Sequence, residues 1–354
     1  MKGPDGRRQA AMDRRSFLKA GAGASTLMSA LRARGAAAQG QASGRGAVDM
    51  HAHWTPEAYN QALSEVGSTP RQNNSPYNID LDRRVQWMDE HSVQTHCLTI
   101  LTPPWRWASA ALAERLTRIV NDAAVEAHEA HPDRLVAGVA MPVQDPKLAL
   151  AELNRVGGNP AFRAVHLPNS LNGLDYVFEP EFEPILARCQ ELEYPLLFHP
   201  VTAVPDAERL EGPAFLNNTI GFPMEHTIVA AKFVTSGLLD KFPTLDILLS
   251  HAGGAFPYVA GRVEHGLRRR DISTPRPMRE YIRRFHYDTI AYYPETLRFL
   301  VNLVGADRVV VGTDNFARMD LDDPTALVEE LNLSPVDHNL IISGNANRLL
   351  KLTT

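Results

Sequence analysis

The stretch VDMHAHWTP, residues 48–56, places two histidines one residue apart, directly behind a short apolar run. In an extended strand, residues i and i+2 point to the same face. The side chains of His51 and His53 would therefore project side by side, close enough to share one metal ion. A His-x-His pair can also be ordinary surface chemistry in a chain with 13 histidines, so its meaning depends on the rest of the sequence.

Short apolar runs recur along the chain, and each ends in polar residues. The eight runs are residues 46–53, 95–103, 135–142, 162–169, 194–200, 245–253, 285–291 and 308–315. Helix-like segments lie between them, at residues 112–132, 147–158, 183–193, 296–305 and 327–334. Eight buried-strand patterns that alternate with helices predict an α/β protein with a (β/α)8 barrel, the TIM-barrel architecture. The alternative is a doubly wound open sheet, but no glycine-rich phosphate fingerprint follows the first strand.

The N-terminal region has the layout of an export signal. Arg14 and Arg15 precede Phe-Leu-Lys and a modest apolar stretch, which ends in small residues near Ala38. We therefore predict a twin-arginine-type signal peptide and linker over residues 1–40, and a periplasmic protein. A disordered basic tail or a short amphipathic helix is the alternative. The apolar stretch is too short for a permanent membrane anchor. We predict that the remaining residues, 41–354, form a single barrel domain.

Charge and cysteine content narrow the possible functions. Residues 1–40 contain eight Lys or Arg and two Asp, which is a net charge of +6. Because the whole chain has a net charge of −5, residues 41–354 have a net charge of −11. An acidic body without a basic stripe argues against binding to nucleic acid. The two cysteines, Cys97 and Cys189, each stand in an apolar setting and are expected to be buried free thiols.

Five polar side chains mark the ends of the predicted strands, where function concentrates in such barrels. They are His51 and His53 on the first strand, His199 on the fifth, His251 on the sixth and Asp314 on the eighth. Imidazole and carboxylate ligands suit Zn²⁺, and also other divalent ions such as Mn²⁺. Three histidines and one carboxylate leave room for a water, whose pKa a zinc ion can bring to about 7. We expect one divalent ion, zinc first and manganese as the alternative.

This order of ligands resembles the amidohydrolase superfamily, whose barrel carries His-x-His on strand one, His on strands five and six, and Asp on strand eight. A finer resemblance is to its aminocarboxymuconate-semialdehyde decarboxylase branch. It is carried by HPDRLVAGVAMPVQDPKLALAEL (131–153), GFPMEHT (221–227), FPTLDILLSHAGGAFPYVAGRVEHG (242–266), VVVGTDN (309–315) and GNANRLL (344–350). The resemblance covers roughly residues 48–350. It implies a carbon–carbon lyase that removes CO2 without an organic cofactor, although hydrolases also occur among the relatives.

The resemblance also implies roles for the five strand-end residues. His51, His53, His199 and Asp314 would ligate the metal. His251 would be a non-ligand that hydrogen-bonds the metal-bound water or assists proton transfer, and Asp314 would also move a proton. Decarboxylation needs a proton delivered to the carbon that loses CO2, and a His/Asp pair supplies an acid and a base.

The fourth strand bears on the number of metal ions. Binuclear members of the superfamily place a carboxylated lysine there, but FRAVHLPN, residues 162–169, contains no lysine. One ion is therefore expected. His166 on this strand either faces the pocket or is a hydrogen-bonded structural histidine.

Substrate recognition is assigned to two groups of residues. Arg262 and Arg270 stand where the resemblance places arginines that bind substrate carboxylates. In the family these arginines act partly across a dimer interface, so the resemblance implies a homodimer. The alternative is that the two arginines belong to a solvated basic helix end. Arg71 is a counterpart of a further substrate-binding arginine after strand one. Trp105 and Trp107 follow strand two and would form an aromatic wall over a planar ring, unless they serve in interface packing.

Three functions compete. The first is a metal-dependent decarboxylase of an aromatic or unsaturated carboxylic acid. The second is a hydrolase that acts on a lactone, ester or amide with the same metal site. The third, a non-catalytic periplasmic binding protein, is disfavoured because all four predicted metal ligands are present. In the first reading, the partner of the protein is a small-molecule carboxylic acid.

Overall fold

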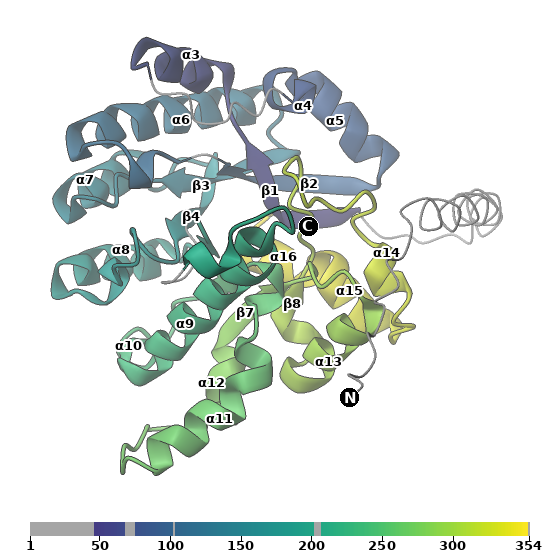
Figure 1. Cartoon of the computed structure of the whole chain (residues 1–354). Helices are drawn as coiled ribbons and strands as arrows, with labels where there is room; N and C mark the ends of the chain where they lie inside the picture. Colours follow the sequence, from purple (N-terminus) through teal and green to yellow (C-terminus); the bar gives the residue numbers. More distant parts are fainter. Residues whose placement is uncertain (1–45, 68–74, 102, 202–206, 353–354) are drawn as a thin grey trace, which may run out of the picture. The chain divides into compact units, whose positions relative to one another are not determined.

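The computed structural model describes residues 46–67, 75–101, 103–201 and 207–352 (Figure 1). The predicted export segment, residues 1–40, and Arg71 lie outside the described residues, so both stay predictions. Within the described ranges, no helix combines the length and the apolar character needed to cross a bilayer.

Eight parallel strands form one sheet in which each strand pairs with the next along the chain. The strands are β1 (Ala47–Trp54), β2 (Val93–Ile100), β3 (Leu135–Ala140), β4 (Phe162–Pro168), β5 (Leu196–His199), β6 (Ile247–Leu249), β7 (Phe285–Asp288) and β8 (Val309–Val310). The sheet closes on itself, because Asp49 of β1 bridges Val311 just after β8, and the Met50 N–H donates to the Val311 carbonyl at 3.0 Å. The predicted (β/α)8 barrel is confirmed.

The helices surround the barrel, and α16 packs against an apolar cluster at one end of it (Figure 1). They are α3 (Glu57–Glu65), α4 (Pro76–Ile79), α5 (Leu81–Glu90), α6 (Ala110–Ala130), α7 (Pro146–Val156), α8 (Glu183–Leu192), α9 (Phe222–Thr235), α10 (Leu238–Lys241), α11 (Phe256–Arg268), α12 (Met278–Tyr281), α13 (Pro294–Val304), α14 (Ala326–Glu329), α15 (Pro335–Asn339) and α16 (Asn345–Leu349). All five predicted helical segments are present, α14 being shorter than expected. The predicted segments did not include α3, α5, α9 and α11. In α9 the apolar residues occupy most sides of the helix and leave no stripe of period 3.6.

Two layers of side chains fill the barrel around β1. Val48 and Met50 pack with Cys97 in an apolar cluster that α16 helps to cover. The pairing of β1 with β2 then shifts in register between Asp49 and Ala52. Because side chains alternate between the two faces of a strand, such a shift re-aims the residues beyond it. This irregularity lets apolar side chains fill one end of the barrel interior, while the histidines that follow point into the other end.

Candidate active site

The five strand-end residues converge on one point. His51 Nε2 lies 3.2 Å from His53 Nε2, which in turn lies 3.2 Å from His199 Nε2. The carboxylate of Asp314 completes the group, with Oδ1 2.9 Å from His53 Nε2 and 3.4 Å from His51 Nε2. His251 is close as well, since one ring nitrogen each of His251, His51 and His199 and one carboxylate oxygen of Asp314 all lie within 4.8 Å of one another.

His251 lies farther from the Asp314 carboxylate than the two histidines of β1 do. Its Nε2 lies 4.0 Å from Asp314 Oδ2, the carboxylate oxygen that does not face His53. His53 Nε2, by contrast, is within 3.2 Å of its neighbours on three sides. His251 therefore offers a ligand atom to the same group of side chains, but at a longer distance from Asp314 than His53.

Buried polar groups outside the cluster orient His53. The hydroxyl of Thr99 lies 3.3 Å from His53 Nδ1, which leaves Nε2 free to face the cluster. Arg84, fully buried on α5, donates to the His53 carbonyl at 2.9 Å and to His96 Nδ1 at 3.0 Å. Partners of this kind fix the tautomer and the ring orientation of a metal-binding histidine.

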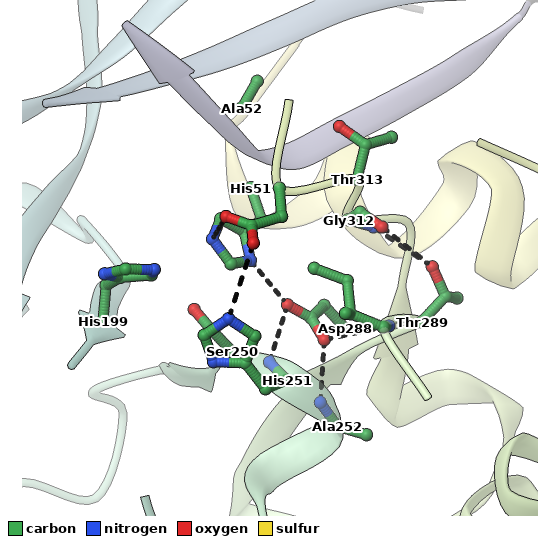
Figure 2. A network of polar contacts seen from close by, with 12 residues as sticks. His51, Ala52, His199, Ser250, His251, Ala252, Asp288, Thr289, Gly312 and Thr313 are labelled. Carbon is green, nitrogen blue, oxygen red and sulfur yellow. Dashed lines mark hydrogen bonds and ion pairs between the residues drawn. The ribbon is translucent and has the colours of Figure 1, made fainter. Parts of the chain in front are cut away.

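Asp288, at the end of β7, holds the other side of the cluster together, as Figure 2 shows. Its Oδ2 accepts a hydrogen bond from His51 Nδ1 at 2.8 Å and from the backbone N–H of His251 at 3.0 Å. Its Oδ1 accepts from the N–H of Ala252 at 2.8 Å. The sequence analysis missed this residue, although FHYDTIA places a carboxylate at a strand end in the same way that GTDN places Asp314.

The two carboxylates favour positive charge at this point. Burial raises the pKa of Asp314, but hydrogen bonds from His51 and His53 outweigh burial and hold the pKa far below its usual value. Burial likewise lowers the pKa of His51, yet its bonds to Asp288 and Asp314 raise that pKa to about 10. Burial lowers the pKa of His53 and His199, so both rings favour the neutral form that binds metals.

Three non-glycine residues of the site adopt left-handed backbone conformations, with φ of 52° at His251, 54° at Ala252 and 60° at Asp314. Each such residue costs on the order of 1–3 kcal/mol, and it persists only where neighbouring contacts enforce it. Here Asp288 binds the N–H groups of His251 and Ala252, and the Asp314 N–H donates to the His51 carbonyl at 2.9 Å. Strain therefore gathers at the residues that aim the functional groups.

A cavity of about 910 Å³ opens over the cluster. Its floor includes His53, His199, His251 and Asp314, and its other lining residues are Leu101, Pro103, Arg106, Trp107, Pro200, Val201, Phe215, Asn218, Phe222, Phe316, Ala317, Arg318 and Met319. The walls are thus largely aromatic and apolar, with two arginines. This composition suits a planar organic acid.

The predicted role of Trp105 in an aromatic wall is wrong for this structure. Its indole is 1 % exposed, donates to the Met141 carbonyl at 2.7 Å and does not line the cavity. Trp107, two residues later, lines the cavity instead. The sequence could not show which tryptophan lines the cavity. Pro104–Arg106 form a short 3-10 turn, and only tertiary packing decides which side of this turn faces the cavity.

The predicted substrate arginines lie elsewhere. Arg262, on α11, and Arg270, just beyond its end, are exposed and do not line the cavity. Their proposed action across a dimer interface stays a prediction. Arg106 and Arg318, which the sequence analysis did not select, line the cavity within this chain, and neither has an ion-pair partner among the described residues. The hydrogen bond of Arg106 goes to the Val201 carbonyl, at 3.1 Å.

His166 matches neither of its two predicted roles. The ring is fully buried beside Trp105, with 5.0 Å between the ring centroids, and it does not line the cavity. Neither ring nitrogen has a hydrogen-bond partner among the described residues. Burial holds its pKa well below 6.5, so the ring is neutral.

Comparisons with known proteins agree with this geometry. The family model described as Amidohydrolase matches residues 48–352. The chain belongs to the amidohydrolase family. A gamma-resorcylate decarboxylase from Polaromonas sp. strain JS666 is 31% identical to this amidohydrolase over 291 residues, which cover 77% of this chain and 87% of the relative. A 2-amino-3-carboxymuconate-6-semialdehyde decarboxylase from Dictyostelium discoideum is 27% identical over 279 residues, covering 77% of each chain.

Solved structures give the same picture. This amidohydrolase is similar to the crystal structure of a dihydroxybenzoic acid decarboxylase from Polaromonas sp. JS666, which has bound manganese and the inhibitor 2-nitroresorcinol. The TM-score is 0.75 at 29% identity, over 87% of this chain and 97% of that one. A 2,6-dihydroxybenzoate decarboxylase from Rhizobium gives a TM-score of 0.76 at 26% identity, over 87% and 99% of the two chains.

Replacing His166 by leucine should make the stability of the protein less sensitive to acid. The unfolded chain takes up a proton at this histidine below about pH 6.5, and the folded protein does not. His166 therefore lowers the free energy of unfolding as the pH falls, by up to about 1.4 kcal/mol per pH unit. Urea unfolding of wild type and His166→Leu between about pH 7 and pH 5 measures the difference. Parallel curves for the two proteins would contradict it.

Proposed function

We propose that this amidohydrolase is a metal-dependent decarboxylase of an aromatic carboxylic acid. The observation that carries the proposal is a His/Asp cluster, which includes His251, on the floor of a cavity with aromatic walls. Two further observations support it: the relatives compared above are named as decarboxylases, and one neighbour was solved as a complex with 2,6-dihydroxybenzoate. None of these comparisons favours the hydrolase alternative.

The inner cluster fits one metal ion. Two nitrogens that each lie about 2.0–2.1 Å from a common ion at the tetrahedral angle are about 3.3–3.4 Å apart. The distances from His53 Nε2 to His51 Nε2 and to His199 Nε2, 3.2 Å each, approach that spacing. We therefore propose His51, His53, His199 and Asp314 as the ligands, with His251 outside the shell.

We propose zinc as the ion, because three imidazoles and one carboxylate at near-tetrahedral spacing form a zinc-type donor set. Manganese is the alternative, since the Polaromonas neighbour contains it. That ion prefers a more oxygen-rich, octahedral environment, which the protein groups here do not complete by themselves.

When bound, the ion supplies positive charge that stabilises oxygens of the substrate. The residues of the chain do the rest. The aromatic walls hold the ring and exclude water. The C–C bond to the carboxylate breaks, CO2 leaves, and the electron pair that remains on the ring carbon takes one proton. Asp314 Oδ2 and His251 Nε2 lie 4.0 Å apart, and we assign to these two groups the holding and the transfer of that proton.

The two cavity arginines extend the proposal to the far end of the substrate. Arg106 and Arg318 come from the segments that follow β2 and β8, and both line the cavity. Guanidinium pairs with carboxylates and other oxyanions in a bidentate way. We therefore place an acidic or hydroxyl substituent of the substrate near these residues.

The roles in the cluster can be tested by metal analysis together with CO2 release from a panel of hydroxybenzoic and unsaturated acids. His53→Ala should lose the ion and all turnover, because His53 Nε2 is the centre of the ligand group. His251→Ala should keep the ion and lose about 10²–10⁴-fold in turnover, as expected for an acid/base group. Full turnover in a metal-replete His251→Ala variant would refute its role, and hydrolysis of lactones without CO2 release would refute the decarboxylase.

Arg318→Met should raise KM by about tenfold or more for an acid with a second acidic substituent, because a hydrogen bond to a charged group contributes about 1.5–3 kcal/mol. The kcat should change little, since Arg318 does not belong to the proton-transfer pair. Arg279→Met, which removes an exposed arginine outside the cavity lining, is the matched control. Equal KM values for both variants and wild type would exclude Arg318 from substrate binding.

We also propose that residues 1–40 direct export to the periplasm, on the basis of Arg14-Arg15 and the residues after them. Replacing both arginines by lysine should retain the protein in the cytoplasm, which cell fractionation measures. Unchanged export of the double variant would show that this region is not a twin-arginine signal.

A further inference from the structure

Three polar side chains form a hydrogen-bonded row that ends at His251. Asn169 Nδ2 lies 2.9 Å from His226 Nδ1, and His226 Nε2 lies 3.2 Å from His251 Nδ1. Asn169 directly follows β4, His226 lies on α9, and His251 is the second residue after β6. Asn169 and His226 are 2 % and 0 % exposed, and neither lines the cavity. The row therefore lies behind His251, on the side away from substrate.

The direction of each hydrogen bond follows from the Asn169 end. The Asn169 amide nitrogen can only donate, so His226 Nδ1 accepts and must be bare. The hydrogen of the His226 ring is therefore on Nε2, which donates to His251 Nδ1. An imidazole that accepts at Nδ1 carries its hydrogen on Nε2, so His251 turns an N–H toward Asp314.

The opposite direction is unfavourable. It would require His251 Nδ1–H to donate to His226, and His226 Nδ1–H to donate to the Asn169 carbonyl oxygen. The bare lone pair of His251 Nε2 would then face the Asp314 carboxylate at 4.0 Å, with no hydrogen between them. Only the first direction agrees with the Asn169 amide nitrogen that faces His226 Nδ1 and also places a hydrogen of His251 toward Asp314.

We propose that Asn169 and His226 are positioning residues, which hold the His251 imidazole in one orientation and in its Nε2–H tautomer. His251 then presents a hydrogen-bond donor to the cavity. In a histidine, the hydrogen bond made by one ring nitrogen sets the state of the other. A neutral imidazole N–H that faces the cavity can stabilise negative charge that develops on a substrate, and it carries the hydrogen that the acid/base role of His251 would move. The catalytic consequence rests on the proposed decarboxylase function, whereas the tautomer is a property of the resting protein.

The test compares His226→Gln with His226→Leu in zinc-loaded protein labelled with ¹⁵N-histidine. A glutamine amide can still donate to His251 Nδ1, but leucine cannot. Long-range ¹H–¹⁵N spectra should show His251 with a protonated Nε2 and a bare Nδ1 in wild type and in His226→Gln. His226→Leu should give mixed tautomers and lose about 10–100-fold in kcat, the usual effect of removing an orienting partner. KM and zinc content should not change, because His226 touches neither the cavity nor the proposed ligands.

Two further variants keep the test decisive. Asn169→Leu should shift the His251 spectrum in the same direction as His226→Leu, and it serves if the latter does not fold. His286→Gln is the matched control, because His286 is a buried histidine on β7 that bonds Asp246 at 3.1 Å, away from the row; its kcat should equal that of wild type. An unchanged His251 tautomer in the leucine variants would overturn the proposal. Absence of CO2 release from every acid tested would overturn the decarboxylase function and leave the tautomer result standing.

Discussion

The Asp288 carboxylate ties together three parts of the chain that lie far apart in sequence. It binds the His51 ring from β1 and the backbone N–H groups of His251 and Ala252 after β6, while itself ending β7 (Figure 2). These contacts are buried, where an unpaired carboxylate would be costly. They also hold the left-handed backbone at His251 and Ala252. The positions of the two histidines relative to each other thus depend on one side chain that lines no part of the cavity.

Glycine at position 312 is required by the same arrangement. A Cβ on Gly312 would lie 2.7 Å from the Cβ of Asp288 and 3.0 Å from that of His51, so the chain after β8 can approach this pair only without a side chain. Asp314, two residues later, lies 2.9 Å from His53 Nε2 and 3.4 Å from His51 Nε2, whereas Asp288 binds the other nitrogen of the His51 ring. Two carboxylates with His51 between them create a site that favours positive charge, whether the charge is a proton on His51 or a metal ion.

Sequence reasoning succeeded where chemistry and strand position coincide. His51, His53, His199, His251 and Asp314 each end an apolar run, and the barrel brings the ends of parallel strands to one rim. It failed where orientation depends on local packing. Trp105 is buried, and Trp107 lines the cavity instead. Arg106 and Arg318 were not recognised, because the loops that carry these two arginines have no periodic sequence signal. His226 was hidden within an apolar helix, and it acquires a partner only through the fold.

The sequence by itself determined the class of fold and the residue types of the site, because alternating apolar runs and strand-end histidines are local patterns that survive without coordinates. The pairing of His51 with His53 on one face also follows from strand geometry alone. Only the tertiary structure decided which groups face one another. The register shift in β1 re-aims its side chains, Asp288 selects the orientation of His51, and the row from Asn169 to His251 sets a tautomer. Each of these depends on contacts between residues distant in the chain, for which a single sequence carries no distance information.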